Sequence, residues 1–400
     1  MSRFPGVAVR LGAALLVGAS ALGCAGASAQ GSAQGASPKG GGDGTAGPEP
    51  IVSPVVVVGP DGVADTVELL GRADAELAAE RYAEAARLYQ RVVDHERDAT
   101  RRRAAWLGLG TARDLGGDPA GALDGYQRFL DAGAAGDERA RIQVRTVRLL
   151  LFVERYQEAR ARSLEVSMDG RAPLERVALS TARAWGVLAR DSSEEAERAA
   201  ERDLARAADE LESLGALYAE RPPLDVAAWS LARGQLLERR AARIVFDPLP
   251  GDFAATLERR CQALLDAQSA YSDAMRSQSA HYSALAGVRV AALYQQLHHD
   301  LLAMPPPAAV DTQERRALFE ASLRLRYAVL LEKAGTLLRH TVQMVERTGE
   351  GLESAERARA ALGELEAAER AEQQALAAQP YSRAQLEQAL RDLSERSRRP

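Results

Sequence analysis

Residues 106–129 read WLGLGTARDLGGDPAGALDGYQRF, and the pattern in this stretch recurs along the chain. Ala122 belongs to a series spaced by 37, 37 and 37 residues: Ala85, Ala122, Ala159 and Ala196. Twelve residues before each member of that series stands a small residue or a valine: Ala73, Gly110, Val147 and Ala184. An internal period of about 20–50 residues is typical of stacked supersecondary units. Because alanine is frequent and aromatic residues make up only 5% of the chain, helices are favoured over strands as the elements of that unit.

The second copy resembles the tetratricopeptide repeat (TPR), a helix-turn-helix unit, through these residues: Trp106, Leu109, Gly110, Gly117, Pro119, Ala122, Tyr126 and Phe129. The resemblance implies that small residues at the Gly110 and Ala122 positions let two antiparallel helices cross closely. The aromatic residue at the Tyr126 position then fills the hole between successive repeats. Ala85 and Ala159 mark the same signature in copies one and three, whereas copy four has lost both aromatic positions. The alternative is an alanine-rich helical bundle with accidental spacing.

We therefore expect an all-α fold, a TPR-type α-solenoid of helix-turn-helix repeats. About four copies occupy residues 64–220, a degenerate TPR-like helical region occupies 221–349, and C-terminal helices occupy 350–400. After the fourth copy, the breaks and caps predict helices at about 224–245, 253–277, 281–304, 312–347 and 352–378. A proline triplet at 305–307 forces one break, since proline lacks the backbone N–H. Ser382 and Gln385 form a capping box for a last helix.

Composition excludes several classes of protein. Hydrophobic residues make up 46% of the chain and charged residues 27%, as in ordinary soluble proteins, so wholesale disorder is excluded. A formal net charge of −5 argues against a general nucleic-acid binder. Two cysteines cannot build a disulfide framework. A mean hydropathy of −0.25, with one apolar run at the N-terminus, excludes a polytopic membrane protein.

Residues 1–23 have the features of a lipoprotein signal peptide. Two arginines precede an apolar run of about a dozen residues, which is long enough for export but too short to span a bilayer. The run ends in Ala21-Leu22-Gly23-Cys24, which resembles a bacterial lipobox and implies lipidation of Cys24. Two alternatives stay open. An ordinary signal peptidase would cut after Ala29 in Ala27-Ser28-Ala29, or the N-terminus would stay uncleaved in the cytoplasm.

Residues 24–50 are dominated by glycine, serine and alanine, with few bulky apolar side chains. Such a segment cannot bury enough surface to offset its ordering entropy, so we expect a flexible tether. Ala25 stands where an aspartate would resemble an inner-membrane retention signal, which favours an outer-membrane lipoprotein facing the periplasm. A soluble periplasmic protein is the alternative address. Val55 to Val58 predict either a short strand or an extended segment docked on the first helix.

Few residues are candidates for a catalytic or metal-binding role. His298 and His299 are adjacent, and neighbours on a helix point about 100° apart, so both cannot ligate one metal ion. Arg259 and Arg260 precede Cys261 and would lower the pKa of its thiol, but no partner motif accompanies it. A structural, half-buried thiol is the favoured interpretation. We expect no metal site, no cofactor and no catalytic constellation.

The predicted partner surface is the concave face that the first helix of each pair lines in a solenoid. Six first-helix residues at exposed phases are candidates: Glu76 and Glu80 in copy one, Arg113 and Asp114 in copy two, and Arg145 and Arg148 in copy three. Their mixed signs favour a partner recognised by its charge pattern rather than a hydrophobic helix.

Residues 261–349 are similar to the C-terminal halves of TPR outer-membrane lipoproteins from gliding delta-type bacteria. The similarity rests on Ala270-Tyr271, Ala291-Ala292-Leu293-Tyr294, the proline triplet and Leu331-Glu332-Lys333-Ala334. It implies a non-enzymatic scaffold lipoprotein in an envelope complex, either motility machinery or outer-membrane assembly. The implied partners are envelope proteins, and outer-membrane lipid through an acylated Cys24. The alternatives are a secreted periplasmic adaptor for peptidoglycan enzymes, or an enzyme using Tyr294, His298 and His299.

Overall fold

The computed structural model describes residues 65–307, 310–348 and 352–388. Every regular element in these ranges is helical, which confirms the all-α prediction. The predicted signal peptide, Cys24, the tether and the Val55–Val58 segment lie outside the described residues. By its internal contacts the chain divides after Ala132. We call residues 65–132 the N-terminal unit and residues 133–388 the C-terminal unit, and describe each by itself.

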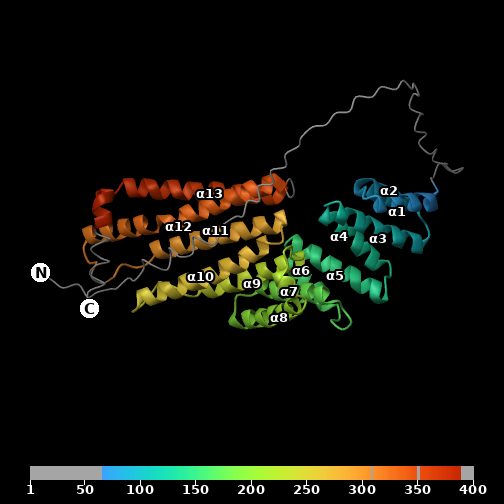
Figure 1. The fold of residues 1–400 in the computed structure, drawn as a ribbon, viewed down its shortest axis with the longest axis horizontal. Helices are drawn as coiled ribbons and strands as arrows, with labels where there is room; N and C mark the ends of the chain where they lie inside the picture. The colour runs from blue at the N-terminus through green and yellow to red at the C-terminus, as the bar shows by residue number, and fades with distance from the viewer. Residues whose placement is uncertain (1–64, 308–309, 349–351, 389–400) are drawn as a thin grey trace, which may run out of the picture. The chain divides into compact units, whose positions relative to one another are not determined.

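The N-terminal unit consists of two consecutive helix pairs: α1 (Thr66–Ala78) with α2 (Tyr82–His95), and α3 (Ala99–Leu115) with α4 (Pro119–Asp131) (Figure 1). Aspartates cap three of these helices, because the side chains of Asp65, Asp98 and Asp118 each accept a hydrogen bond from a backbone N–H of the first turn. Leu69, Leu88 and Leu109 lie in one buried cluster to which α1, α2 and α3 all contribute.

The 37-residue period corresponds to helix pairs. The second helices α2, α4 and α6 begin at Tyr82, Pro119 and Tyr156, which are 37 residues apart. Each has its repeat alanine three residues later, and Ala85, Ala122 and Ala159 are fully buried. The packing of consecutive helix pairs is compatible with a helical-repeat solenoid.

Close helix crossing occurs where the repeat places its small residues. A Cβ atom built on Gly110 would lie 2.6 Å from the ring of Tyr126, so α3 and α4 could not approach this closely with a larger residue there. Tyr89, the equivalent aromatic residue of the first copy, lies against Gly108 of α3, the first helix of the next pair. For copy one, this confirms that the aromatic position packs onto the following repeat.

Glu96 joins the first helix pair to the second. Its carboxylate accepts hydrogen bonds from the Thr66 hydroxyl at 2.8 Å, the Asp98 backbone N–H at 2.8 Å and Arg101 Nε at 2.6 Å. The Arg101 guanidinium, with these other donors, lowers the pKa of Glu96 to about 2. The start of α1, the α2–α3 connection and the start of α3 therefore meet at one carboxylate.

The turn between the two helices of a pair also repeats. Glu80, Gly117 and Glu154 stand 37 residues apart, and all have positive φ, at 59°, 79° and 61°. In each turn the next residue's N–H donates to the carbonyl oxygen five residues before it, for example Arg81 N to Glu76 O at 2.9 Å and Asp118 N to Arg113 O at 2.8 Å. This is the Schellman arrangement, which favours glycine at the positive-φ position.

We expect Glu80→Gly to raise the free energy of unfolding by about 0.5–1 kcal/mol, because glycine has no Cβ to clash at positive φ. Gly117→Ala introduces that clash in the second turn and is expected to lower the free energy of unfolding by about 1 kcal/mol. Urea denaturation measures both. Ala79→Gly, with an ordinary φ of −85°, is the control and is expected to lose stability. A Glu80→Gly protein no more stable than wild type would contradict the turn geometry.

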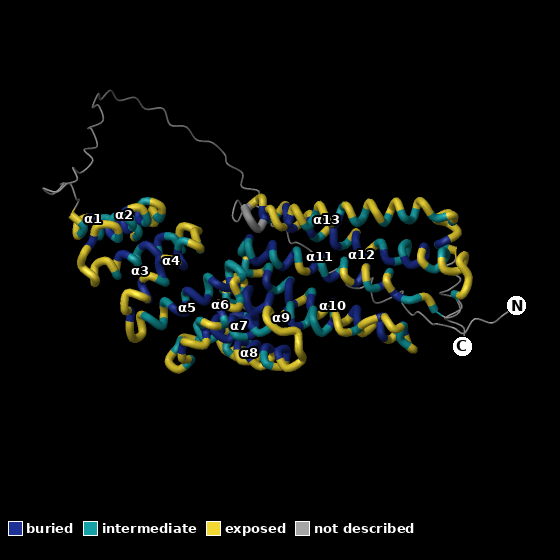
Figure 2. Tube along the Cα trace, turned by 180° about the vertical axis from the view of Figure 1, so that it is seen from behind, coloured by how far each residue is buried: buried dark blue, intermediate teal, exposed yellow. Residues whose placement is uncertain are grey.

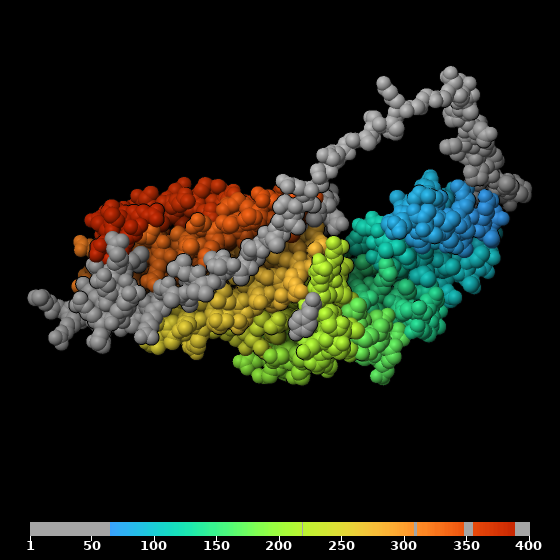
Figure 3. Space-filling model, in the orientation of Figure 1, coloured from blue at the N-terminus to red at the C-terminus, as the bar shows by residue number. Residues whose placement is uncertain are grey.

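The C-terminal unit is a longer succession of packed helices: α5 (Gly136–Phe152), α6 (Tyr156–Leu164), α7 (Pro173–Arg190), α8 (Glu194–Ser213), the 3-10 helix η2 (Ala216–Tyr218), α9 (Leu224–Ala242), α10 (Phe253–Met275), α11 (Ala280–Leu302), α12 (Gln313–Thr348) and α13 (Leu352–Ala377). Figure 2 shows α13 with an exposed outer side and an inner side of mostly intermediate burial. Figure 3 shows the side chains of α10 to α13 in contact along the visible face.

The five helices predicted after the fourth copy are confirmed within a few residues of their ends as α9 to α13. The proline triplet lies between α11 and α12, where the break was predicted. The capping box is also confirmed, because Ser382 N donates to Gln385 Oε1 at 2.8 Å and Gln385 N donates to Ser382 Oγ at 3.3 Å. Among all the described helices, none is both long enough and apolar enough to cross a membrane.

Candidate functional site

The two predicted groove residues of copy one lie at the end of α1 and beyond it. Glu76 accepts a hydrogen bond from Arg81, and this contact lowers the pKa of the Glu76 carboxyl. Glu80 is exposed, but it is not a first-helix residue as predicted, since it lies in the α1–α2 turn. Neither side chain projects from the middle of the first helix.

Arg113 and Asp114 of α3 contact other elements of the N-terminal unit. The Arg113 guanidinium donates to the Gly121 carbonyl oxygen of α4 and to Gln90 Oε1 of α2, both at 3.2 Å. Asp114 accepts the Tyr126 hydroxyl at 3.1 Å. These two side chains therefore hold α3 against its neighbours. Two of the six residues predicted to contact a partner thus make hydrogen bonds within the protein.

Arg148 of α5 forms a bidentate ion pair with Asp225 of α9. The Nε–Oδ1 and Nη2–Oδ2 distances are both 2.9 Å. The Asp225 side chain is only 13% exposed. Its burial raises the pKa of the Asp225 carboxyl, and Arg148 opposes that rise. Arg145, on the same helix, is half-buried. The structure thus brings Arg148 to a buried partner far away in the sequence.

A different set of first-helix residues is exposed. Val67 of α1 is 56% exposed, and the positions 37 and 74 residues later, Ala104 and Arg141, are exposed as well. On α1 the exposed residues share one side of the helix, since they follow the spacing of helical turns. They are Val67, Glu68, Gly71, Asp74, Ala75 and Ala78. These positions were not predicted because only charged residues were considered as groove candidates. The 37-residue spacing alone would have identified them.

The second helices present a different surface. On α2, Arg87 pairs with Glu84, and on α4 Arg128 pairs with Asp124 at 3.0 Å. Such pairs along one helix are typical of a solvated face. In the N-terminal unit, the exposed charged residues of α1, Glu68 and Asp74, are both acidic, whereas those of α2 and α4 carry both signs.

The histidines and the cysteine of the C-terminal unit differ in how far their side chains are buried. His298 is buried and His299 is exposed, as expected for neighbours on a helix, and burial lowers the pKa of His298. Tyr294 donates to Gln268 at 2.7 Å. Burial raises the pKa of the Cys261 thiol and outweighs the lowering by Arg260, and the thiol is free and buried. Within the described part of the chain, no three His, Cys, Asp or Glu side chains are grouped to hold a metal ion.

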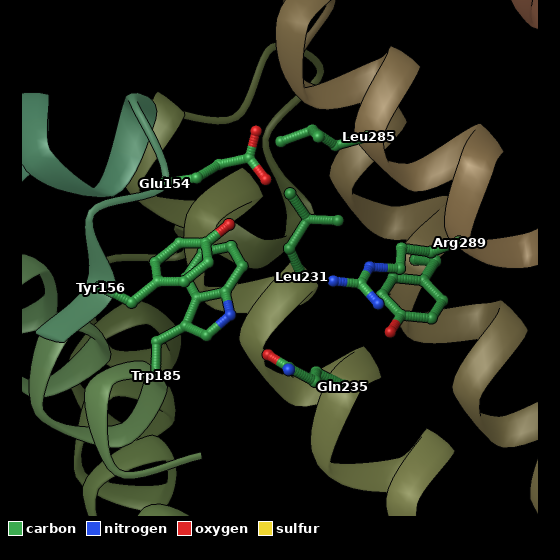
Figure 4. Close-up of a pocket in the computed structure, with 8 residues that line it drawn as sticks. Glu154, Tyr156, Trp185, Leu231, Gln235, Leu285 and Arg289 are labelled. Atoms are coloured by element: carbon green, nitrogen blue, oxygen red, sulfur yellow. The ribbon is translucent and has the colours of Figure 1, made fainter. Parts of the chain in front are cut away.

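A small recess lies inside the C-terminal unit where α6, α7, α9, α10 and α11 converge (Figure 4). Its volume is about 20 Å³, and the residues that line it are Glu154, Tyr156, Trp185, Leu231, Gln235, Tyr271, Leu285 and Arg289. Tyr156 and Trp185 stack with their ring centroids 4.3 Å apart. Nothing in the sequence links Trp185 to α9 or α11, so this recess could not be predicted from it.

Two buried polar atoms of the recess, Trp185 Nε1 and Gln235 Oε1, have no hydrogen-bond partner among the described residues. An unsatisfied buried donor or acceptor costs about 1–3 kcal/mol. Burial raises the pKa of the two phenols, Tyr156 and Tyr271, so both stay protonated at neutral pH. Trp185 Nε1 and Gln235 Oε1 are inaccessible to solvent, so the recess itself offers neutral aromatic walls and no free hydrogen-bonding atom from these two side chains.

No protein-family profile matches the chain, and no curated protein matches it.

Proposed function

We propose that this chain is a non-enzymatic scaffold of the TPR type, which binds other proteins through the exposed faces of its first helices. The observation that carries the proposal is the 37-residue period of buried alanines, which coincides with consecutive helix pairs. Arrays of this kind hold their first helices on one side and use them to seat peptides or partner helices.

The exposed face of α1 combines small or apolar side chains with acidic ones. Val67, Gly71, Ala75 and Ala78 are small or apolar, and Glu68 and Asp74 are exposed on the same side of α1. The charged candidates Arg113, Asp114 and Arg148 are occupied by internal hydrogen bonds and ion pairs. The proposed contact surface therefore combines small and apolar groups with the acidic side chains Glu68 and Asp74, in place of the charged residues first selected.

The proposed location is the outer membrane, with the chain anchored by a lipid on Cys24 and facing the periplasm. This part rests on the lipobox-like residues 21–24 and the glycine-rich residues that follow. The envelope process that the resemblance implies is motility machinery or outer-membrane assembly.

Cell fractionation tests the anchor. Wild-type protein is expected in the membrane fraction, and Cys24→Ser is expected to move it to the soluble fraction, because the acyl chains supply the attachment. Cys261→Ser is the matched control and is expected to leave the distribution unchanged. Wild-type protein found in the soluble fraction would contradict the proposed lipid anchor. It would favour a secreted adaptor whose signal peptide is cleaved after Ala29.

Copurification from cells tests the binding face. Val67→Arg with Ala104→Arg is expected to remove a copurifying envelope protein, because a buried unpaired charge opposes docking. Ala83→Arg with Ala120→Arg is the matched control, since these exposed residues occupy equivalent positions on the second helices. Equal loss from both pairs, or from neither, would count against the first-helix face.

A further inference from the structure

Equivalent positions on α1 and α3 form one surface of the N-terminal unit. The two helices are in contact and contribute to one buried cluster. Five positions of α1 recur 37 residues later on α3, and their side chains are exposed or half-buried on both helices. We call these ten residues the α1–α3 face: Val67, Leu70, Asp74, Leu77 and Ala78 on α1, and Ala104, Leu107, Thr111, Asp114 and Leu115 on α3. Both charged members are acidic.

Apolar side chains lie at both ends of the α1–α3 face. Val67 is 56% exposed and Leu115 is 49% exposed, whereas Leu70, Leu77 and Leu107 are half-buried. Val67 and Leu77 are separated by about 15 Å along α1, at the usual helical rise. Two apolar contacts at that distance match the side chains that a partner helix presents on one side over about three turns.

A negative charge lies between the apolar ends. Asp74 is exposed, and the hydroxyl of Tyr89 donates to its Oδ1 at 2.5 Å. The equivalent tyrosine of the second copy, Tyr126, donates to Oδ2 of the half-buried Asp114 at 3.1 Å. Burial and the nearby Asp74 raise the pKa of Tyr89, so its hydroxyl stays a donor at neutral pH. Because a carboxylate accepts several hydrogen bonds, Tyr89 holds Asp74 in place and leaves it able to accept another donor.

The arginines closest in sequence to the α1–α3 face contact other groups. Arg101 donates to Glu96 at 2.6 Å, and Arg113 donates to Gln90 at 3.2 Å. Arg72 lies on the side of α1 that carries Glu76, and it helps to lower the pKa of that carboxyl. The negative charge of the α1–α3 face therefore has no basic counterpart within the face itself.

We infer that the α1–α3 face binds a cationic amphipathic helix of a partner protein. Apolar side chains of that helix contact Val67, Leu77 and Leu115, and a lysine or arginine pairs with Asp74. An acidic helix would bring like charges together, and an uncharged helix would desolvate Asp74 without a counter-charge. The inference rests on the proposed scaffold function and specifies the chemistry of its partner.

Fluorescence anisotropy with two labelled peptides tests the inference on the full chain carrying Cys24→Ser. Each peptide is a helix of about 14 residues, close to the length of α1, with the same leucines along one side. Lysines flank the leucines in one peptide and glutamates flank them in the other. The lysine peptide is expected to bind with a dissociation constant on the order of 10 μM, and the glutamate peptide at least about tenfold more weakly.

Two variants separate the α1–α3 face from general attraction of a cation to an acidic protein. Asp74→Asn keeps an oxygen for the Tyr89 hydroxyl but removes the charge, and it is expected to weaken binding of the lysine peptide about fivefold. Asp124→Asn removes one exposed carboxylate from α4 and is the matched control, expected to leave the affinity unchanged. Circular dichroism and thermal unfolding check that both variants fold as the wild type does.

The outcomes distinguish this inference from the proposed function. Equal affinities for the two peptides, equal losses from Asp74→Asn and Asp124→Asn, or no binding of the lysine peptide would each overturn the inference. Copurification of an envelope protein that Val67→Arg with Ala104→Arg abolishes, but that Asp74→Asn leaves intact, would also overturn it and would leave the proposed function standing. Peptide selectivity that Asp74→Asn removes, together with loss of the copurifying protein in the same variant, is the result that supports it.

Discussion

Replacing Asp300 with alanine is expected to lower the free energy of unfolding by about 3–5 kcal/mol, because it strands a buried guanidinium without its counter-charge. The Arg260 side chain is only 2% exposed, and its Nη2 donates to Asp300 Oδ2 at 2.9 Å. Nε and Nη1 of Arg260 have no partner in the described residues, so Asp300 supplies the ionic partner of this group. Burial correspondingly lowers the pKa of Arg260.

The same geometry predicts a much smaller loss for Arg260→Met, since an apolar side chain of similar length removes the unpaired N–H groups along with the charge. The double variant Arg260→Met/Asp300→Ala is expected to be close to Arg260→Met alone. Gln296→Ala removes only the hydrogen bond that Asp300 accepts from Gln296 at 2.6 Å, and it serves as the control. Urea denaturation measures all four proteins. An Asp300→Ala loss no greater than that of Gln296→Ala would show that the pair is not essential.

Replacing Arg148 with methionine is expected to lower the free energy of unfolding by about 2–4 kcal/mol at neutral pH, because Asp225 is then buried as an unpaired carboxylate. Arg148→Met/Asp225→Asn is expected to recover much of this loss, since it removes the uncompensated charge. Urea denaturation of the single and double variants measures the coupling. If Arg148 instead served only partner binding, Arg148→Met would leave the stability unchanged.

The pH dependence of the Arg148→Met loss follows from the raised pKa of Asp225. A carboxyl whose pKa is higher in the folded than in the unfolded state takes up a proton on folding, so its contribution to stability improves as the pH falls through the folded pKa. Without Arg148 that pKa rises further. The stability deficit of Arg148→Met is therefore expected to shrink between about pH 8 and about pH 5. A deficit that is constant or grows on acidification would contradict this assignment.

The positions of the helices could be predicted because the sequence features that mark them are local. The alanine period placed the buried helix crossings at Ala85, Ala122 and Ala159, and the proline triplet placed the break before α12. The turn geometry at Glu80 and Glu154 was not predicted, because glutamate gives no sign of a positive φ. Only Gly117, at the equivalent position, has the residue type that such a turn favours.

The candidate site was harder to predict because its contacts are distant in the sequence. Arg148 was selected as exposed from its helical phase, yet Asp225, 77 residues away, accepts its hydrogen bonds. A charged side chain at an exposed phase can reach either solvent or a neighbouring helix, and periodicity does not distinguish these. The recess likewise depends on Trp185, Gln235 and Arg289 from three helices, whose meeting follows from packing alone.

Site-specific photocrosslinking in living cells tests the central claim, that the first helices bind a protein partner. A photoreactive residue is placed at Val67, Ala104 or Arg141, and in matched proteins at Ala83, Ala120 or Gln157, the exposed equivalents on the second helices. One envelope protein crosslinked from the first set and absent from the second is the predicted result. The same adducts from both sets, or adducts without any protein, would contradict the scaffold account.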